Sequence, residues 1–229
     1  MVRDLAAHAV NSSPDLLSAA FYDWAALGLS TAFRGIEWAQ ESKEKVKCAA
    51  IQLRKGCPPA LQPMAFIPGD FNFLDKHRRP LHGPARSCAR YVTITWRTQK
   101  NNINGQQVTF GRAKTAFLCP VRAVVRIQDR AELIQHPLGL LGVASDGPIT
   151  KFDATNHLRA RATRVYGYTD KDDLNMYTLH SIRVGACVLL HEMGKTATFI
   201  KDCLRWRSEN FMDYLRNTPR IAAQHAACL

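Results

Sequence analysis

The residues whose side chains are best suited to catalysis lie in the last fifty positions of the chain. His180 and Arg183 are three positions apart, so a helix would place them on one face. Trp206 follows between two arginines, and Tyr214 stands a short interval further on. A guanidinium binds phosphate oxygens through forked hydrogen bonds, an imidazole moves protons near neutral pH, and an indole N–H donates. Together these groups suit attack of the tyrosine hydroxyl on a phosphodiester.

Each of these residues taken alone has an ordinary explanation. A His-x-x-Arg pair is more often an exposed pair on a solvated helix, and a single tryptophan more often packs in a core or interface. A helical tyrosine also packs more often than it reacts. A phenol with its usual pKa of about 10 is a poor nucleophile, so it needs cationic neighbours or a base. The order of the residues along the chain therefore carries the chemical interpretation.

With further residues upstream, this set resembles the catalytic domain of the tyrosine recombinases, also called phage-integrase-type recombinases. The family pattern is an early arginine closely followed by an acid, a hairpin lysine, a His-x-x-Arg helix, a histidine or tryptophan, and a nucleophilic tyrosine. The resemblance covers roughly residues 13 to 218 and looks most like recombinase-like proteins of eukaryotic mobile elements. The matching residues, in that order, are Arg34, Glu37, Lys100, His180, Arg183, Trp206 and Tyr214.

The resemblance implies cleavage and rejoining of DNA strands through a 3′-phosphotyrosyl intermediate, as in site-specific recombination or integration. Tyr214 would attack the scissile phosphate and leave a free 5′-hydroxyl on the other strand end. Arg34 and Arg183 would hold the non-bridging oxygens and stabilise the charge of the transition state. Lys100 would protonate the departing 5′-oxygen as a general acid.

The remaining residues of the pattern would assist these groups. His180 would help to move the phenol proton and, with the Trp206 N–H, would hold the phosphate. Glu37 would orient the arginine or the histidine side of the site. The resemblance implies no metal ion and no cofactor, because the two guanidinium groups supply the positive charge.

The chain also departs from the family pattern. The glycine that usually precedes the His or Trp segment is absent, since Leu204 precedes Arg205. The interval from Trp206 to Tyr214 is one residue shorter than the commoner spacing. Full recombinases carry an N-terminal core-binding domain, which we expect to be missing here. We therefore expect a single catalytic domain over residues 1–229, with a core of about 13–218.

Apolar patterning predicts an α+β fold that is mostly helical with a small antiparallel sheet. Ser13 and Pro14 mark a helix start, and the helix should continue to Phe33 with a break at Gly28. The segment 34–37 ends this helical region or begins the next one, and 167–175 is expected to be a polar loop. Expected strands are 64–67, 71–74, 91–97 and 106–110, the last two forming the Lys100 hairpin, and expected helices are 120–133, 154–165, 179–193, 197–204 and 209–215.

The composition favours a nucleic-acid partner inside the cell. Thirty-one Lys and Arg against nineteen Asp and Glu give a net charge of +12, which attracts polyanions, although a basic but inert surface would look the same. Seven scattered cysteines without a CxxC pair predict reduced thiols and no metal site. No apolar run approaches the roughly 20 residues of a membrane helix. We expect double-stranded DNA as partner, a homo-oligomer such as a tetramer on DNA, and location in the nucleus or, in a bacterium, the cytoplasm.

Three functions stay open on these observations. The first is strand cleavage and rejoining, the second a catalytically inactive DNA-binding remnant of a mobile element, and the third a type IB topoisomerase-like enzyme. The intact residue set argues against the second and the short chain against the third, whereas the missing clamp domain argues for impaired activity. Further basic residues are candidates for DNA-backbone contacts or are merely solvated: Lys76, Arg78, Arg79, Arg97, Arg205 and Arg207.

Overall fold

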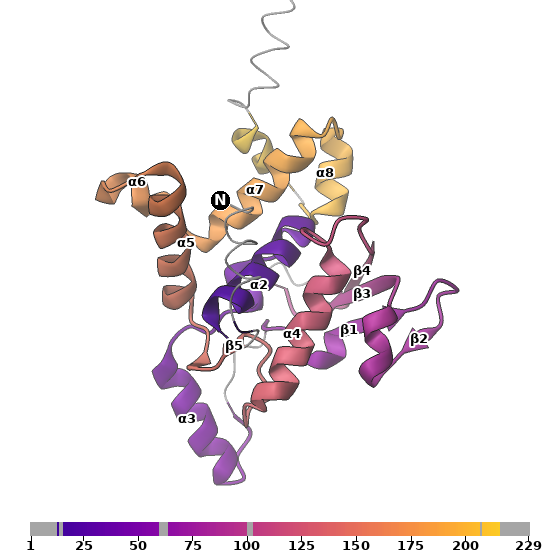
Figure 1. Ribbon diagram of the computed structural model, residues 1–229, viewed down its shortest axis with the longest axis vertical. Helices are drawn as coiled ribbons and strands as arrows, with labels where there is room; N and C mark the ends of the chain where they lie inside the picture. Colours follow the sequence, from indigo (N-terminus) through magenta and orange to yellow (C-terminus); the bar gives the residue numbers. More distant parts are fainter. Residues whose placement is uncertain (1–12, 14–15, 60–63, 100–102, 207, 216–229) are drawn as a thin grey trace, which may run out of the picture.

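The computed structural model describes residue 13 and residues 16–59, 64–99, 103–206 and 208–215. Over these residues the chain forms a mostly helical α+β structure with one small antiparallel sheet and a minor two-stranded pair (Figure 1). The predicted fold class is thus confirmed at this level.

Helix α2 (Leu17–Thr31) lies at the centre of the structure and is buried around most of its circumference. Its sequence is dominated by alanine and aromatic residues, and a helix that is apolar on all sides belongs in a core. Three other helices pack against it: α4 (Pro120–Ile134), α5 (Lys151–Tyr166) and α7 (Leu179–Glu192). The helix that carries His180 and Arg183 is therefore seated directly on the central helix.

The antiparallel sheet has the strand order β2-β1-β3-β4 and lies beside α4. Alternation along β3 buries Val92, Ile94 and Trp96 and leaves the intervening threonines half-buried, as the sequence pattern predicted. The strands are β1 (Phe71–Leu74), β2 (Pro80–Leu81), β3 (Tyr91–Trp96) and β4 (Gln106–Gly111), with a separate pair β5 (Val143–Ala144) and β6 (Gly147–Pro148).

A group of stacked aromatic rings joins the central helix to the sheet. Trp24 stacks on Trp38 with ring centroids 5.2 Å apart, and Phe33 meets Trp24 edge-on at 5.8 Å. Phe66 extends the group to Trp96 on β3, with centroids 5.8 Å apart. Because Phe33 and Trp38 are both anchored here, the chain between them, which carries Arg34 and Glu37, is held in place at both ends.

The C-terminal helices build a second, smaller core on α7. Helix α8 (Ala197–Cys203) and the 3₁₀ helix η4 (Glu209–Tyr214) pack there around Phe211, which is fully buried. Burial of Phe211 three positions before Tyr214 fixes the orientation of that last turn.

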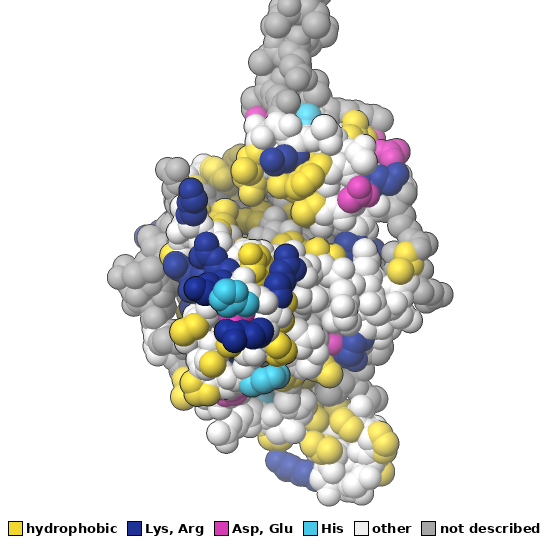
Figure 2. All heavy atoms as spheres, turned by 90° about the vertical axis from the view of Figure 1, so that its right-hand side faces the viewer, with side chains coloured by type: hydrophobic (Ala, Val, Ile, Leu, Met, Phe, Trp, Pro, Cys, Tyr) yellow, Lys and Arg dark blue, Asp and Glu magenta, His cyan; other side chains and the backbone are white. Residues whose placement is uncertain are grey.

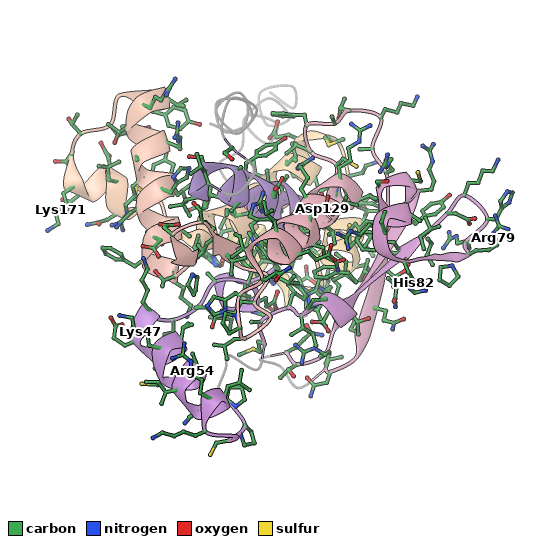
Figure 3. The ribbon with its side chains drawn as sticks, turned by 60° about the horizontal axis from the view of Figure 1, so that its bottom comes forward. Lys47, Arg54, Arg79, His82, Asp129 and Lys171 are labelled. Carbon is green, nitrogen blue, oxygen red and sulfur yellow. The ribbon has the colours of Figure 1, made fainter. Side chains whose placement is uncertain are left out.

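Two helices project from the body of the molecule. Helix α3 (Lys43–Arg54) begins at Ser42, whose side chain accepts a hydrogen bond from the Lys45 N–H, and it is largely exposed. Helix α6 (Lys171–Asn175) is capped by the Asp170 side chain. Figure 3 shows Lys47 and Arg54 on α3, Lys171 on α6, and Arg79 at the opposite end of the molecule.

Several expected boundaries were wrong. The sequence pattern missed α3 and β2, residues 64–67 form no strand, and α6 lies within the expected polar loop. The helix expected over 209–215 is present as the 3₁₀ helix η4. Gly28 does not break α2; a Cβ built there would lie 2.7 Å from Ile182 Cγ2, so the glycine allows α2 and α7 to approach closely. Within the described ranges no helix is long and apolar enough to cross a bilayer.

Candidate functional site

A pocket of about 410 Å³ lies where α7, the segment following α2 and η4 meet. It brings together five of the residues expected from the sequence pattern, although they come from three separate parts of the chain. These are Arg34, His180, Arg183, Trp206 and Tyr214.

Tyr214 and His180 face each other at this pocket. The Tyr214 hydroxyl and His180 Nε2 are hydrogen-bonded at 2.9 Å, and the two rings meet edge-on with centroids 5.7 Å apart. Burial of the imidazole, and then the nearby Arg183 charge, lower the pKa of His180 below its ordinary value. A neutral imidazole at neutral pH has one unprotonated nitrogen, so this pair has the composition of a nucleophile and its base.

Arg183 is almost completely buried, with 4% of its surface exposed. Its guanidinium donates to the Ala32 carbonyl and lies over the Trp206 ring, 4.0 Å from the centroid. Burial, and then repulsion from Arg34, lower the pKa of Arg183 to about 10. The side chain is therefore still charged at neutral pH and is held by protein groups from two directions.

Arg34 reaches the pocket from the single turn of 3₁₀ helix η1 (Gly35–Glu37). Glu37, fully buried, accepts from the Arg34 backbone N–H at 2.9 Å and pairs with its guanidinium at 3.3 Å. A Cβ at Gly35 would lie 2.9 Å from Leu179 Cδ1, so this glycine lets the start of α7 pack against the turn. Local sequence thus places the arginine next to the His180 helix.

Arg205, expected at a DNA-facing surface, is instead buried, with 8% of its surface exposed. Its guanidinium lies over the Trp96 ring, 3.6 Å from the centroid, and donates to the Gln99 side-chain oxygen at 2.8 Å. Glu37 lies 3.5 Å away. Burial lowers the pKa of Arg205 to about 10 despite the opposing effect of Glu37. This residue therefore belongs to the interior of the site.

Trp206 supports the pocket through its ring face rather than through its N–H. The Nε1 atom is buried beside the Cys187 thiol, with which it makes at most a weak hydrogen bond. Burial raises the pKa of that thiol, and the indole N–H lowers it in part. The expectation that the indole N–H points at a phosphate does not fit this conformation.

The site carries an excess of positive charge. Glu37 is the one carboxylate that pairs with Arg34 and Arg205 in the part of the chain that the structure describes. The Arg183 guanidinium instead contacts the Ala32 carbonyl and the Trp206 ring. Burial first, and then repulsion among the arginines, lower the pKa of both Arg183 and Arg205. A bound anion would offset this repulsion.

The expected backbone-contact residues fall into different environments. Arg97 donates to Asp70 at 2.6 Å and to the Ala65 carbonyl at 2.8 Å, so part of its guanidinium is engaged within the fold. Arg79 pairs with Asp75 at 2.8 Å in the turn between β1 and β2. Lys100 and Arg207 lie outside the described residues.

Basic side chains gather on the face that Figure 2 presents, which is the side of the sheet and of the β1–β2 turn in Figure 1. The turn itself is well defined, because the Asp75 side chain accepts from the backbone N–H groups of both His77 and Arg79. Arg78 lies over the Tyr91 ring at 4.7 Å. The exposed cations at this end of the sheet include Lys76, Arg78, Arg79 and Arg90.

Sequence reasoning missed three residues of the site. Asn210 lines the pocket from η4, and Trp96 and Gln99 hold the Arg205 guanidinium. One signal was present in the sequence: Arg205 follows a predicted helix at the position where glycine is usual. The partners of that arginine come from another part of the chain and left no local pattern.

No protein-family model matches the chain, and a search of the curated proteins found no match. Among the described residues, no group of three or more His, Cys, Asp or Glu side chains could hold a metal ion. The six described cysteines are free, and Cys228 lies outside the described residues. The function must therefore be argued from the geometry of the pocket.

Proposed function

We propose that this protein cleaves and rejoins DNA strands in the manner of a tyrosine recombinase, with Tyr214 as the nucleophile. The observation that carries the proposal is the hydrogen bond between the Tyr214 hydroxyl and His180 Nε2, 2.9 Å long, in a pocket that also contains Arg34 and Arg183. The order of these residues along the chain, which resembles that family, supports it independently. The tyrosine-recombinase fold and the single-domain organisation belong to the same proposal.

In the proposed reaction, the Tyr214 oxygen attacks the scissile phosphorus and His180 takes up the phenol proton. The bond from phosphorus to the 5′-oxygen breaks, leaving a 3′-phosphotyrosyl linkage and a 5′-hydroxyl after the departing oxygen is protonated. The resemblance assigns that protonation to Lys100. Attack by a 5′-hydroxyl reverses these steps and rejoins the strand, so the energy of the broken bond is conserved in the intermediate.

The arginines would stabilise the phosphate during transfer. Guanidinium groups form charge-assisted hydrogen bonds to phosphate oxygens, and they are most effective when fixed in a site with little water. Arg183 is buried and held by the Ala32 carbonyl and the Trp206 ring, whereas Arg34 keeps 28% of its side-chain surface exposed beside it. This arrangement suits one guanidinium fixed in advance and one able to close on the substrate.

Duplex DNA is the proposed partner, bound with the sheet side of the molecule toward the backbone. The net charge of +12 and the basic residues around the β1–β2 turn, which face the viewer in Figure 2, favour a polyanion. A homo-oligomer on DNA, such as a tetramer, would be needed for exchange between two duplexes.

The test is a suicide duplex, in which a nick beside the cleavage position lets the 5′-product diffuse away and traps the covalent adduct. The wild-type chain should form the adduct and Tyr214→Phe should not, while Tyr168→Phe, at an exposed tyrosine outside the pocket, should resemble the wild type. Because the cleavage sequence is unknown, the duplex is drawn from a randomised library and adducts are recovered by denaturing gel.

Two other outcomes separate the competing functions. If the wild type and Tyr214→Phe both shift DNA on a gel and neither forms an adduct, the protein binds DNA without cleaving it. If the adduct forms and supercoiled plasmid is relaxed without exchange between duplexes, the topoisomerase-like function is the better description. Arg183→Ala should lower the cleavage rate far more than the affinity for DNA. Equal losses in both would indicate that Arg183 only contacts the DNA backbone.

A further inference from the structure

Arg205 combines a backbone conformation and a degree of burial that are unusual for arginine. Its φ angle is 58°, in the left-handed region, at the end of helix α8. The Arg205 N–H donates to the Asp202 carbonyl at 3.3 Å and the Trp206 N–H to the Lys201 carbonyl at 2.8 Å, which closes a helix end that usually requires glycine. Local strain of this kind persists where the surrounding structure imposes it.

The guanidinium of Arg205 connects three separate parts of the fold. It lies 3.6 Å from the centroid of the Trp96 ring on β3, and its Nη1 donates to Gln99 Oε1 at 2.8 Å just beyond that strand. Its Nη2 lies 3.5 Å from Glu37 Oε2 in η1. The C-terminal segment is thereby tied to the sheet and to the turn that carries Arg34.

Glu37 is the group through which this connection reaches the pocket. Its carboxylate also accepts the Trp96 indole N–H at 3.3 Å and pairs with the Arg34 guanidinium at 3.3 Å. Removing Arg205 would take away one of the two guanidinium groups that pair with this carboxylate among the described residues, and would leave it free to change its contact with Arg34. The backbone of Arg205 also leads directly into Trp206, whose ring supports Arg183.

We propose that Arg205 is a positioning residue for the phosphate pocket: it fixes Glu37 against Arg34 and sets the direction of the chain that places Trp206 under Arg183. The identity of the substrate, a DNA phosphodiester, rests on the proposed function. Arg205 itself does not touch the phosphate, because its guanidinium is enclosed by Trp96, Gln99 and Glu37.

The test compares Arg205→Gly with Arg205→Lys. Glycine removes the guanidinium and also relieves the left-handed backbone, whereas lysine keeps a cation but cannot reach Gln99 and Glu37 with a planar fork. Gln135→Gly is the matched control, because Gln135 is an exposed residue that ends α4 with φ of 48°. Three quantities are measured: affinity for inorganic phosphate, the rate of adduct formation on the suicide duplex, and the NMR resonance of the Trp96 indole N–H, assigned with Trp96→Phe.

Arg205→Gly should bind duplex DNA like the wild type but form the adduct about 100-fold more slowly, the scale expected for a misplaced reacting group. Its phosphate affinity should fall about tenfold, the lower end of the losses known for outer-shell residues of metal sites. The Trp96 indole resonance should shift, because its ring loses the Arg205 cation and its acceptor Glu37 loses a neighbour, while that of Trp24 stays. Arg205→Lys should fall between glycine and wild type, and Gln135→Gly should match the wild type.

The proposal is overturned if Arg205→Gly keeps the wild-type phosphate affinity and adduct rate, even where the Trp96 resonance shifts, because loss of the cation over the Trp96 ring shifts that resonance by itself. If that variant does not fold, Arg205→Lys decides: a smaller change in the same direction supports the proposal, and wild-type values overturn it. Phosphate binding and the Trp96 resonance do not require strand cleavage. A wild-type chain that forms no adduct, with phosphate affinity still lost in Arg205→Gly, would therefore reject the proposed function and keep the positioning role.

Discussion

Two glycines at the contact between α2 and α7 should respond differently to alanine: Gly185→Ala should stabilise the fold and Gly28→Ala should not. A Cβ at Gly28 would lie 2.7 Å from Ile182 Cγ2, which is closer than real Cβ atoms come, and 3.0 Å from Phe33 Cζ, which is a tight contact. A Cβ at Gly185 would lie 3.4 Å from Leu29 Cδ2, an ordinary van der Waals separation. Both glycines are inside helices, so the change in helix propensity is the same and packing alone separates them.

The expected magnitudes follow from these separations. Alanine is favoured over glycine in a helix interior by about 1 kcal/mol. Gly185→Ala should keep most of that gain and raise the melting temperature by about 2–4 °C in a chain of this size. At Gly28 the added methyl overpacks the contact, which costs about 1–3 kcal/mol. The free energy of unfolding of Gly28→Ala should therefore lie between the wild-type value and about 2 kcal/mol below it.

Thermal and urea unfolding, followed by circular dichroism, measure both variants under the same conditions. Ile182 is adjacent to Arg183 on α7, so Gly28→Ala should also slow adduct formation, whereas Gly185→Ala should not. Equal stabilisation by the two substitutions would refute the close approach of α2 and α7. Equal destabilisation would show that the contact tolerates no addition on either helix.

Three further outcomes follow from individual contacts. Asp23, 1% exposed, accepts hydrogen bonds from two arginines of α4, so Asp23→Ala should lower the free energy of unfolding by about 3–5 kcal/mol; a loss under about 1 kcal/mol would contradict this. Burial lowers the pKa of His180, so the rate of adduct formation should stay constant through neutral pH and fall only below the ordinary imidazole pKa of about 6.5. In His180→Asn this fall at acidic pH should disappear; an unchanged dependence of the rate on pH would exclude His180 as the base. Lys76→Gln, in the β1–β2 turn, should reduce the slope of log affinity against log salt by about one. Lys171→Gln, at a residue that Figure 3 shows across the molecule from Arg79 of that turn, should leave the slope unchanged; equal slopes in the two variants would contradict DNA binding at the turn.

The lowered pKa of His180 also affects the stability of the fold. The folded chain holds this imidazole neutral more strongly than the unfolded chain does, so the unfolded state binds more protons as the pH falls. The contribution of His180 is present above the unfolded pKa and is lost as the pH drops through the folded one. His180→Asn should therefore be less sensitive to acid than the wild type in urea unfolding.

The elements that sequence predicted best are those whose pattern is local. Alternation along β3 and the apolar stretch of α2 follow directly from which face or side is buried. Helix α3 was missed because only Val46 and Ala49 are buried along it, so its sequence carries little apolar periodicity. Helix α6 was missed because it spans five residues and depends on the Asp170 cap.

The same distinction explains the candidate site. Spacing placed His180 and Arg183 on one helix face. The resemblance implied that Glu37 would orient the arginine or the histidine side, and in the structure it pairs with Arg34 across one turn. The environment of Arg205 could not be predicted in this way, because its partners lie about a hundred positions away and meet it only through the packing of β3 against the C-terminal segment. Long-range burial, rather than residue type, turned an expected surface cation into an interior one.

The charge of the pocket follows from how its arginines are held. Lowering the pKa of Arg183 to about 10 means that roughly 3 kcal/mol opposes its charge, yet the side chain stays protonated at neutral pH. The Ala32 carbonyl and the Trp206 ring fix its position without neutralising it, and Glu37 alone is shared by Arg34 and Arg205 among the contacts of the described residues. Arg183 is thus oriented before any ligand arrives, so an anion that enters gains its attraction without first having to reorganise it.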